Sequence, residues 1–193
     1  MSPVPVFEIG LWNAWIITVF FVLTGIIPGF FVNKERVKKM EGWPPYSRTE
    51  KILALSTHVV IMPVAAIYSI FLPLKIGTAW LYAGLPICFL AGVLTVITYI
   101  NIANTPPDEP VTKGSYHISR NPLYLSAFLT YLGIGVACAS WVFLLFAVAW
   151  VILWHIVLPP EERDLLEKYG DAYREYMNRT PRWIGIPKSI KTD

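Results

Sequence analysis

Charged residues are scarce in this sequence: Asp, Glu, Lys and Arg make up 15% of its 193 residues, whereas soluble domains carry about 25%. Hydrophobic residues make up 55%, which is too many for an intrinsically disordered chain. There are two cysteines, Cys88 and Cys138, both inside apolar runs, so a disulfide-stapled scaffold is excluded. The composition argues against a soluble enzyme and predicts a membrane protein, and the length predicts one domain, 1–193.

Common phosphate, metal and nucleic-acid motifs are also missing. The Gly-x-Gly at 133–135 lies in an apolar run with no strand before it, and no Gly-Lys-Ser/Thr loop is present. His58, His117 and His155 share no metal-ligand spacing, so we expect no metal site. The net charge of +3 comes without a basic cluster among exposed aromatic residues, so we expect no nucleic-acid partner.

Long runs without any charged residue are what the sequence does have. They are 9–32, 52–74, 77–103 and 123–158. Because about 20 apolar residues cross a bilayer, each of the first three predicts one transmembrane helix within residues 1–103. The fourth, as one helix, would be about 54 Å long, so we predict a hairpin of two helices turning near 138–140. A single helix that is tilted or partly outside the membrane is the alternative.

Lys and Arg are distributed unevenly among the loops of this five-span arrangement. Of the 16 Lys and Arg residues, six lie in 33–51, two in 104–122 and seven after residue 159. The five-span arrangement puts these 15 on one side of the membrane and leaves Lys75 on the other. Cytoplasmic loops carry the excess of basic residues, so we expect the N-terminus outside, and the C-terminus and active site in the cytoplasm. The first run lacks the basic start of a signal peptide and is too long for its apolar core, so it is expected to remain as a span.

Polar chemistry concentrates in two segments beside the last two runs, and the first of these is 111–124. Its Gly114 permits close approach of the backbone to a ligand, and the planar fork of Arg120 suits a carboxylate. Pro122 favours the first turn of a helix and leaves neighbouring amides free. An interfacial loop with a snorkelling arginine is the alternative interpretation.

The second polar segment, 159–177, has the pattern of an amphipathic helix on the membrane surface. An apolar side chain recurs every four residues, at Leu165, Tyr169, Tyr173 and Met177. Glu161, Glu162 and Asp164 lie in its first turn, where the helix dipole favours acids. The dipole alone does not explain why these acids and Arg120 meet at the same membrane face.

In order, the two segments contain a Gly-x-Tyr, an Arg-x-Pro-x-Tyr, an acidic pair and a Tyr-Gly-x-x-Tyr-x-x-Tyr. These are Gly114 to Tyr116, Arg120 to Tyr124, Glu161 with Glu162, and Tyr169 to Tyr176. With the hairpin between them, they resemble the isoprenylcysteine carboxyl methyltransferase and phospholipid methyltransferase family of integral membrane enzymes. The resemblance covers 104–183. It implies an all-α, multi-pass protein in which this part holds a cofactor-binding loop, a transmembrane hairpin and an amphipathic cytoplasmic helix.

The resemblance implies S-adenosylmethionine as methyl donor and a lipidic or prenylated acceptor that enters from the bilayer. Such a donor needs a cation for its carboxylate, acceptors for its amine and hydroxyls, and aromatic faces near its sulfonium. The implied cofactor-binding residues are Val111, Gly114, Tyr116, Arg120, Asn121, Pro122, Leu123, Tyr124, Glu161 and Glu162. The implied catalytic positions are Arg120, Asn121, His155 and Glu162.

Two positions depart from the family pattern. Asn121 stands where the family usually has histidine, and an amide cannot change its charge near pH 7. Members that methylate a prenylcysteine carboxylate have an arginine shortly before the acidic pair, where this chain has His155. The acceptor therefore stays open among a carboxylate, an amine and a thiol. A phospholipid amine N-methyltransferase, a nicotinamide-dependent lipid or sterol reductase, and a non-catalytic membrane scaffold are the alternative functions.

Overall fold

The computed structural model describes residues 7–36 and 44–186, which fold into α-helices with no β-strand in the described part. The helices are α1 (Trp15–Gly29), α3 (Arg48–Ser56), α4 (Met62–Ile70), α5 (Ala79–Ala103), α6 (Pro122–Ala137) and α7 (Trp141–Arg179). A π-helical turn, Thr57–Ile61, joins α3 to α4 in one continuous rod, and a short 3-10 helix, Gly114–His117, precedes α6. The all-α prediction is confirmed.

Three helical segments are long and apolar enough to cross a membrane: Arg48–Ile70, Ala79–Ala103 and Trp141–Arg179. Two shorter apolar helices, α1 and α6, have 15 and 16 residues. Helix α1 is shorter than the charge-free run 9–32, because the chain before Trp15 is held against the end of α4. There the Asn13 amide donates to the carbonyls of Glu8 and Ile70 at 2.6 and 2.7 Å.

The hairpin predicted within 123–158 is present, and the single-helix alternative is wrong. The chain reverses between α6 and α7 at residues 138–140, where Ala139 has a φ of 50°. Ser140 caps the start of α7 by accepting a hydrogen bond from the amide of Phe143. A left-handed residue followed by a serine cap ends one helix and begins the next within three residues.

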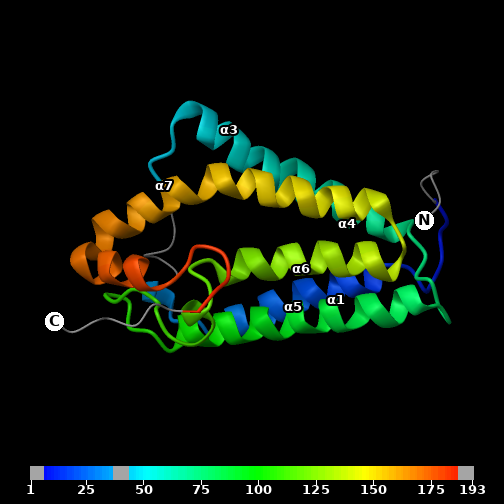
Figure 1. The fold of residues 1–193 in the computed structure, drawn as a ribbon, viewed down its shortest axis with the longest axis horizontal. Helices are drawn as coiled ribbons and strands as arrows, with labels where there is room; N and C mark the ends of the chain where they lie inside the picture. The colour runs from blue at the N-terminus through cyan, green and yellow to red at the C-terminus, as the bar shows by residue number, and fades with distance from the viewer. Residues whose placement is uncertain (1–6, 37–43, 187–193) are drawn as a thin grey trace.

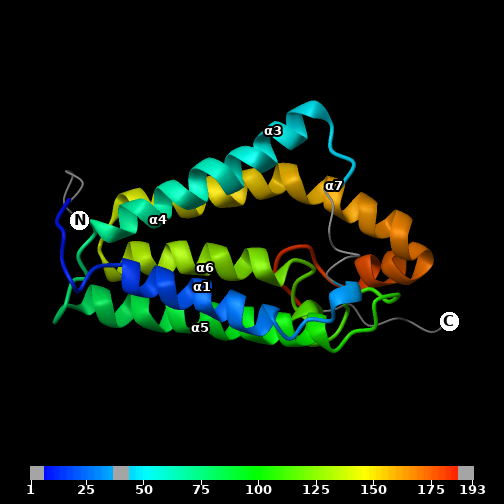
Figure 2. The same cartoon turned by 180° about the vertical axis from the view of Figure 1, so that it is seen from behind.

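The helices form a bundle in which α6 lies between α5 and α7 (Figure 1), and α1 lies alongside α5 (Figure 2). The rod made by α3 and α4 packs on the other side of α7. Small residues permit the close contact of α5 with α6: a Cβ added to Gly84 would lie 2.6 Å from the Cα of Ala137. Membrane helices approach each other through such residues, because van der Waals packing drives their association.

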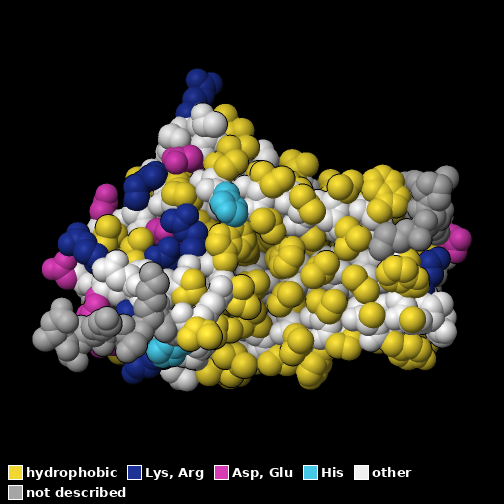
Figure 3. Space-filling model, in the orientation of Figure 1, with side chains coloured by type: hydrophobic (Ala, Val, Ile, Leu, Met, Phe, Trp, Pro, Cys, Tyr) yellow, Lys and Arg dark blue, Asp and Glu magenta, His cyan; other side chains and the backbone are white. Residues whose placement is uncertain are grey.

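Charged side chains gather at one end of the bundle, and hydrophobic side chains cover the visible face of the rest (Figure 3). The loop 104–121 and the described residues that follow α1 and α7, 30–36 and 180–186, lie at this charged end (Figure 1). The hairpin turn lies at the other end, where the Lys75 amide donates to the Ala137 carbonyl. The structure thus brings the described basic segments together, as the five-span prediction requires. That this end faces the cytoplasm stays a prediction.

The expected amphipathic surface helix differs from the observed structure. No new helix begins at Pro159, since α7 continues through both prolines to Gly170, where φ is 55° and the chain turns back. The residues that follow pack on the loop before α6, and Tyr173 and Tyr176 are each 3% exposed. Part of the apolar stripe therefore faces the protein instead of a membrane surface. The cause is the positive φ, which glycine adopts without steric cost.

Candidate functional site

A pocket of about 710 Å³ lies at the charged end of the bundle. Its walls are the loop before α6, the first turn of α6, the part of α7 beyond its apolar stretch and the segment after Gly170. Arg36 and Pro44, from the N-terminal half, also line it. Its volume falls in the range of about 300–1,000 Å³ that small-molecule and cofactor sites occupy.

Most of the expected cofactor-binding residues meet in this pocket. Those that line it are Val111, Tyr116, Arg120, Asn121, Pro122, Leu123, Tyr124 and Glu161. Two others, Gly114 and Glu162, lie behind its wall. Proline at the first position of α6 fixes where the helix starts, and the loop residues just before it therefore face α7.

Gly114 serves packing against α5 and does not line the pocket. Its φ is 62°, and a Cβ there would overlap the side-chain amide of Asn101. That amide donates to the hydroxyl of Ser115 at 3.0 Å, and the same hydroxyl is hydrogen-bonded to Thr98. The glycine thus permits a close backbone approach, as expected, but to a neighbouring helix instead of a ligand.

Arg120 belongs to a buried cluster of two arginines and one carboxylate. Its Nη2 lies 3.0 Å from Oε1 of Glu162, and its Nη1 donates to the carbonyl of Met177 at 3.2 Å. Arg182 also binds Glu162, with Nε 3.2 Å from Oε1 and 3.1 Å from Oε2. The Glu162 side chain is 4% exposed. The cluster therefore holds two positive charges and one negative charge.

The Nε of Arg120 is buried and has no hydrogen-bond partner. A buried donor without a partner costs about 1–3 kcal/mol, and this one belongs to a residue that lines the pocket. An anionic ligand in the pocket would provide both the missing acceptor and the missing negative charge. Arg120 is therefore the strongest candidate for binding a carboxylate.

Glu161 faces the pocket and is held by two phenol hydroxyls. Tyr124 and Tyr46 both donate to its Oε1, the latter at 3.0 Å. Burial, and next the negative charge of Glu161, raise the pKa of Tyr46, so this hydroxyl stays protonated and donates at neutral pH. Because Glu161 lines the pocket, its carboxylate can accept from a ligand's amine or hydroxyl groups. Burial likewise raises the pKa of Tyr116.

Arg36 adds a second cation to the pocket wall. Its Nη1 donates to the carbonyls of Thr105, Pro106 and Glu109 at 3.3, 2.6 and 3.2 Å, and the residue is 3% exposed. Its Nε has no partner, and no carboxylate in 7–36 or 44–186 forms an ion pair with it. Sequence reasoning missed Arg36 and Tyr46, because the basic loop they come from indicated only membrane orientation.

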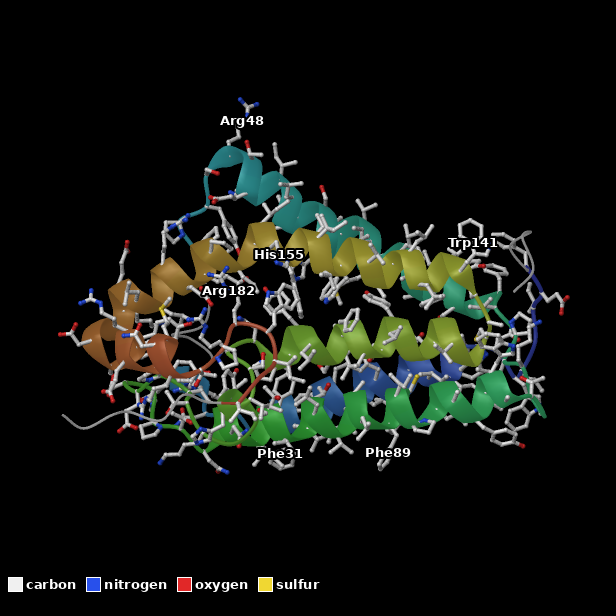
Figure 4. All side chains as sticks on the ribbon, in the orientation of Figure 1. Phe31, Arg48, Phe89, Trp141, His155 and Arg182 are labelled. Atoms are coloured by element: carbon white, nitrogen blue, oxygen red, sulfur yellow. The ribbon has the colours of Figure 1, made fainter. Side chains whose placement is uncertain are left out.

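His155 lies outside the pocket. It is exposed, its Nδ1 is 3.0 Å from the Val151 carbonyl, and its ring packs against Trp183, tilted by 31° with 4.6 Å between centroids. Figure 4 shows His155 on α7 near Arg182, whereas Arg48 points away from the molecule. Trp154 packs between Trp183 and the pocket residue Tyr124. The aromatic layer therefore separates this histidine from the pocket, and its catalytic role stays a prediction.

The pocket residues fit the donor that the sequence resemblance implies. Arg120 and Arg36 offer unpartnered guanidinium nitrogens for a carboxylate, and Glu161 offers an acceptor for an amine or for hydroxyls. Tyrosine rings supply flat faces that attract a sulfonium. They come from Tyr116, Tyr124, Tyr169, Tyr173 and Tyr176. Within the described residues no group of three metal-ligating side chains is found.

Comparison with known proteins gives two matches. Residues 80–172 match the phospholipid methyltransferase family. Methanethiol S-methyltransferase 1 of Bradyrhizobium diazoefficiens is 30% identical over 101 residues, which is 52% of this chain and 35% of that protein, so the chain matches about a third of this relative's length. No solved structure matches. Residues 80–172, which contain the loop, the hairpin and the acidic pair, are thus similar to the phospholipid methyltransferase family, to which the sequence motifs also pointed.

Proposed function

We propose that the protein is an S-adenosylmethionine-dependent methyltransferase whose acceptor reaches the pocket from the bilayer. The observation that carries this proposal is Arg120, a pocket-lining arginine with an unpartnered, buried Nε in a cluster with excess positive charge. The family match of 80–172 supports it, because this segment contains Arg120 and most of the pocket wall.

Each pocket group has a role in holding this donor, which supplies an electrophilic methyl group on a sulfonium. Arg120 binds the carboxylate through Nε, in a charge-assisted hydrogen bond. Glu161 accepts from the amine or the ribose hydroxyls, while Tyr46 and Tyr124 keep its carboxylate in place. Tyr116 lines the slot for the adenosine and sulfonium part.

Alignment and exclusion of water are what the protein contributes to the reaction. Methyl transfer from a sulfonium is an in-line displacement that needs no covalent enzyme intermediate, so positioning supplies most of the acceleration. The transfer also takes the positive charge off the sulfur, which leaves as the thioether: an attacking thiolate cancels the charge, and an attacking amine takes it over and then releases a proton. A dry site favours this loss of concentrated charge over a wet one. Tyr173 and Tyr176, both buried, close the pocket on the side of the folded-back segment.

The acceptor that we propose is a lipidic molecule with an amine or a thiol at its reacting end. A carboxylate acceptor would need a cation where related enzymes have arginine, and His155 at that position packs against Trp183 outside the pocket. The bacterial relative is named for a thiol substrate, and the matched family is named for phospholipids. Activity on a panel of amines, thiols and prenylcysteines with labelled donor distinguishes these classes.

Isothermal titration of the purified full chain tests the proposed donor. We expect S-adenosylmethionine and S-adenosylhomocysteine to bind, and reduced nicotinamide dinucleotides to give no heat of binding. Arg120→Gln should weaken the affinity for both adenosyl ligands by about tenfold or more, because a charge-assisted hydrogen bond is lost. Arg48→Gln, an exposed arginine at the same end, is the control. Binding of the nicotinamide alone would indicate the reductase, and binding of no ligand would indicate the scaffold.

A further inference from the structure

The chain after α7 crosses the loop that contains Arg120. This C-terminal strap, residues 180–186, has two backbone hydrogen bonds to the loop: the Arg120 amide donates to the Pro181 carbonyl, and the Gly185 amide donates to the Ile118 carbonyl, each at 3.0 Å. The Arg182 carbonyl also accepts from the side chains of Ser119 and Asn121 at 3.3 Å. The strap lies beyond the residues that match the family.

Arg182 extends its guanidinium from the strap to the far side of Glu162 from Arg120. It contacts both carboxylate oxygens through Nε and reaches Oε2 again through Nη2, whereas Arg120 contacts Oε1 alone. Most of the hydrogen-bonding capacity of Glu162 is therefore used by Arg182. The Arg182 side chain is 34% exposed and does not line the pocket, so it touches no ligand there.

A carboxylate bound by one arginine forms a bidentate pair that cancels the charge of that arginine. Without Arg182, the buried Glu162 would have Arg120 as its single cationic partner, and the pair would be neutral. With Arg182 present, the three residues have a net charge of +1, and the Arg120 Nε stays unpartnered. The second arginine thus keeps the first available to an anion.

We propose that Arg182 is a positioning residue that shares Glu162 with Arg120 and thereby lets Arg120 bind the carboxylate of the methyl donor. The proposal rests on the proposed function, because it assumes that an adenosyl amino acid occupies the pocket. It extends the donor site beyond the family-matched segment to the C-terminal strap.

The test compares two ligands that differ in the amino-acid part alone. S-adenosylhomocysteine has the carboxylate and amine, whereas 5′-methylthioadenosine keeps the adenosine and the sulfur without them. Isothermal titration with the full chain would measure both ligands on the native protein and on Arg182→Gln, Arg182→Lys and Arg179→Gln. Arg179 is the matched control, because it forms an exposed ion pair with Glu175 just before the strap.

We expect Arg182→Gln to weaken the affinity for S-adenosylhomocysteine by about tenfold, the size of one lost charge-assisted interaction. The affinity for 5′-methylthioadenosine should change by less than twofold. Arg182→Lys should recover most of the loss, and Arg179→Gln should bind as the native protein does. Thermal unfolding in the same detergent verifies that each variant is folded.

An equal loss for both ligands would overturn the proposal, because a strap that only holds the loop in shape affects the whole pocket. Unchanged affinity for S-adenosylhomocysteine would overturn it as well. Failure of the proposed function has a different signature, since the native protein itself would then bind neither ligand.

Discussion

Single residues at this site are explained by the partners that the fold gives them. Arg120, Glu161 and Glu162 were all predicted as site residues from the motifs, but the two acids differ in role. Glu161 faces the pocket with two tyrosine donors, whereas Glu162 lies behind the wall between two arginines. Adjacent residues on an α-helix point about 100° apart, so the two acids of the pair face different neighbours.

Removing the Glu162 carboxylate should destabilise the fold as well as the site. Glu162→Ala leaves Arg120 and Arg182 facing each other with no anion between them. We expect a loss of about 3 kcal/mol in unfolding free energy, the range for breaking a buried ion pair. Reversible denaturant unfolding in mixed micelles measures this loss. Glu175→Ala, which breaks an exposed pair, should cost less than about 0.5 kcal/mol; equal losses would show that the cluster contributes no stability.

At the scale of elements, the final helix has more consequence for the site than any other. The stretch beyond 158 was predicted as a separate surface helix, but it extends α7 and then reverses at Gly170. Both portions form pocket walls, the first through Glu161 and Leu165 and the second through Tyr173. The amphipathic pattern correctly predicted that 159–177 is helical with one apolar face. Such a pattern does not identify whether protein or membrane covers that face.

Gly170 therefore controls the shape of the pocket from outside it. Gly170→Ala adds a Cβ that meets nothing within 4 Å, so any effect comes from the backbone, where φ 55° and ψ −131° suit glycine alone. We expect the free energy of unfolding to fall by about 1–3 kcal/mol, which denaturant unfolding measures. We also expect weaker binding of S-adenosylhomocysteine, which isothermal titration measures.

The matched control for this change is Ala139→Gly, at another residue of positive φ, in the hairpin turn. This substitution relieves strain and should stabilise the protein by up to about 1 kcal/mol without a change in ligand affinity. A Gly170→Ala variant as stable and as active as the native protein would contradict the role given to this turn.

At the scale of the whole molecule, the bundle separates an apolar body from one charged end that holds the pocket. The described basic segments share that end although they lie far apart in the sequence. A charged donor from the aqueous phase and a lipidic acceptor from the bilayer would meet at such a boundary. The proposed reaction requires this geometry.

Cysteine labelling of intact cells tests which side of the membrane the charged end faces. Asp171→Cys places a thiol on an exposed side chain at the charged end, and Ile76→Cys places one at the other end, at a residue 59% exposed. Because basic loops face the cytoplasm, an impermeant maleimide should label the cysteine at 76 and leave that at 171 unlabelled until the cells are opened.

The native cysteines, Cys88 and Cys138, are buried, so the unmodified chain is the control and should stay unlabelled. Labelling of the cysteine at 171 in intact cells would reverse the predicted topology.

The sequence by itself determined the membrane character, the helical segments, the hairpin turn and eight pocket residues near Arg120 and Glu161. These follow from local signals: charge-free length, a proline at a helix start, and motif spacing within one segment. Only the tertiary structure decided that Arg36, Tyr46 and Arg182 join the site, that His155 lies outside it, and that Gly114 packs on α5. Those contacts join residues from 13 to more than 100 positions apart, and their partners are set by how helices pack, which no local pattern encodes.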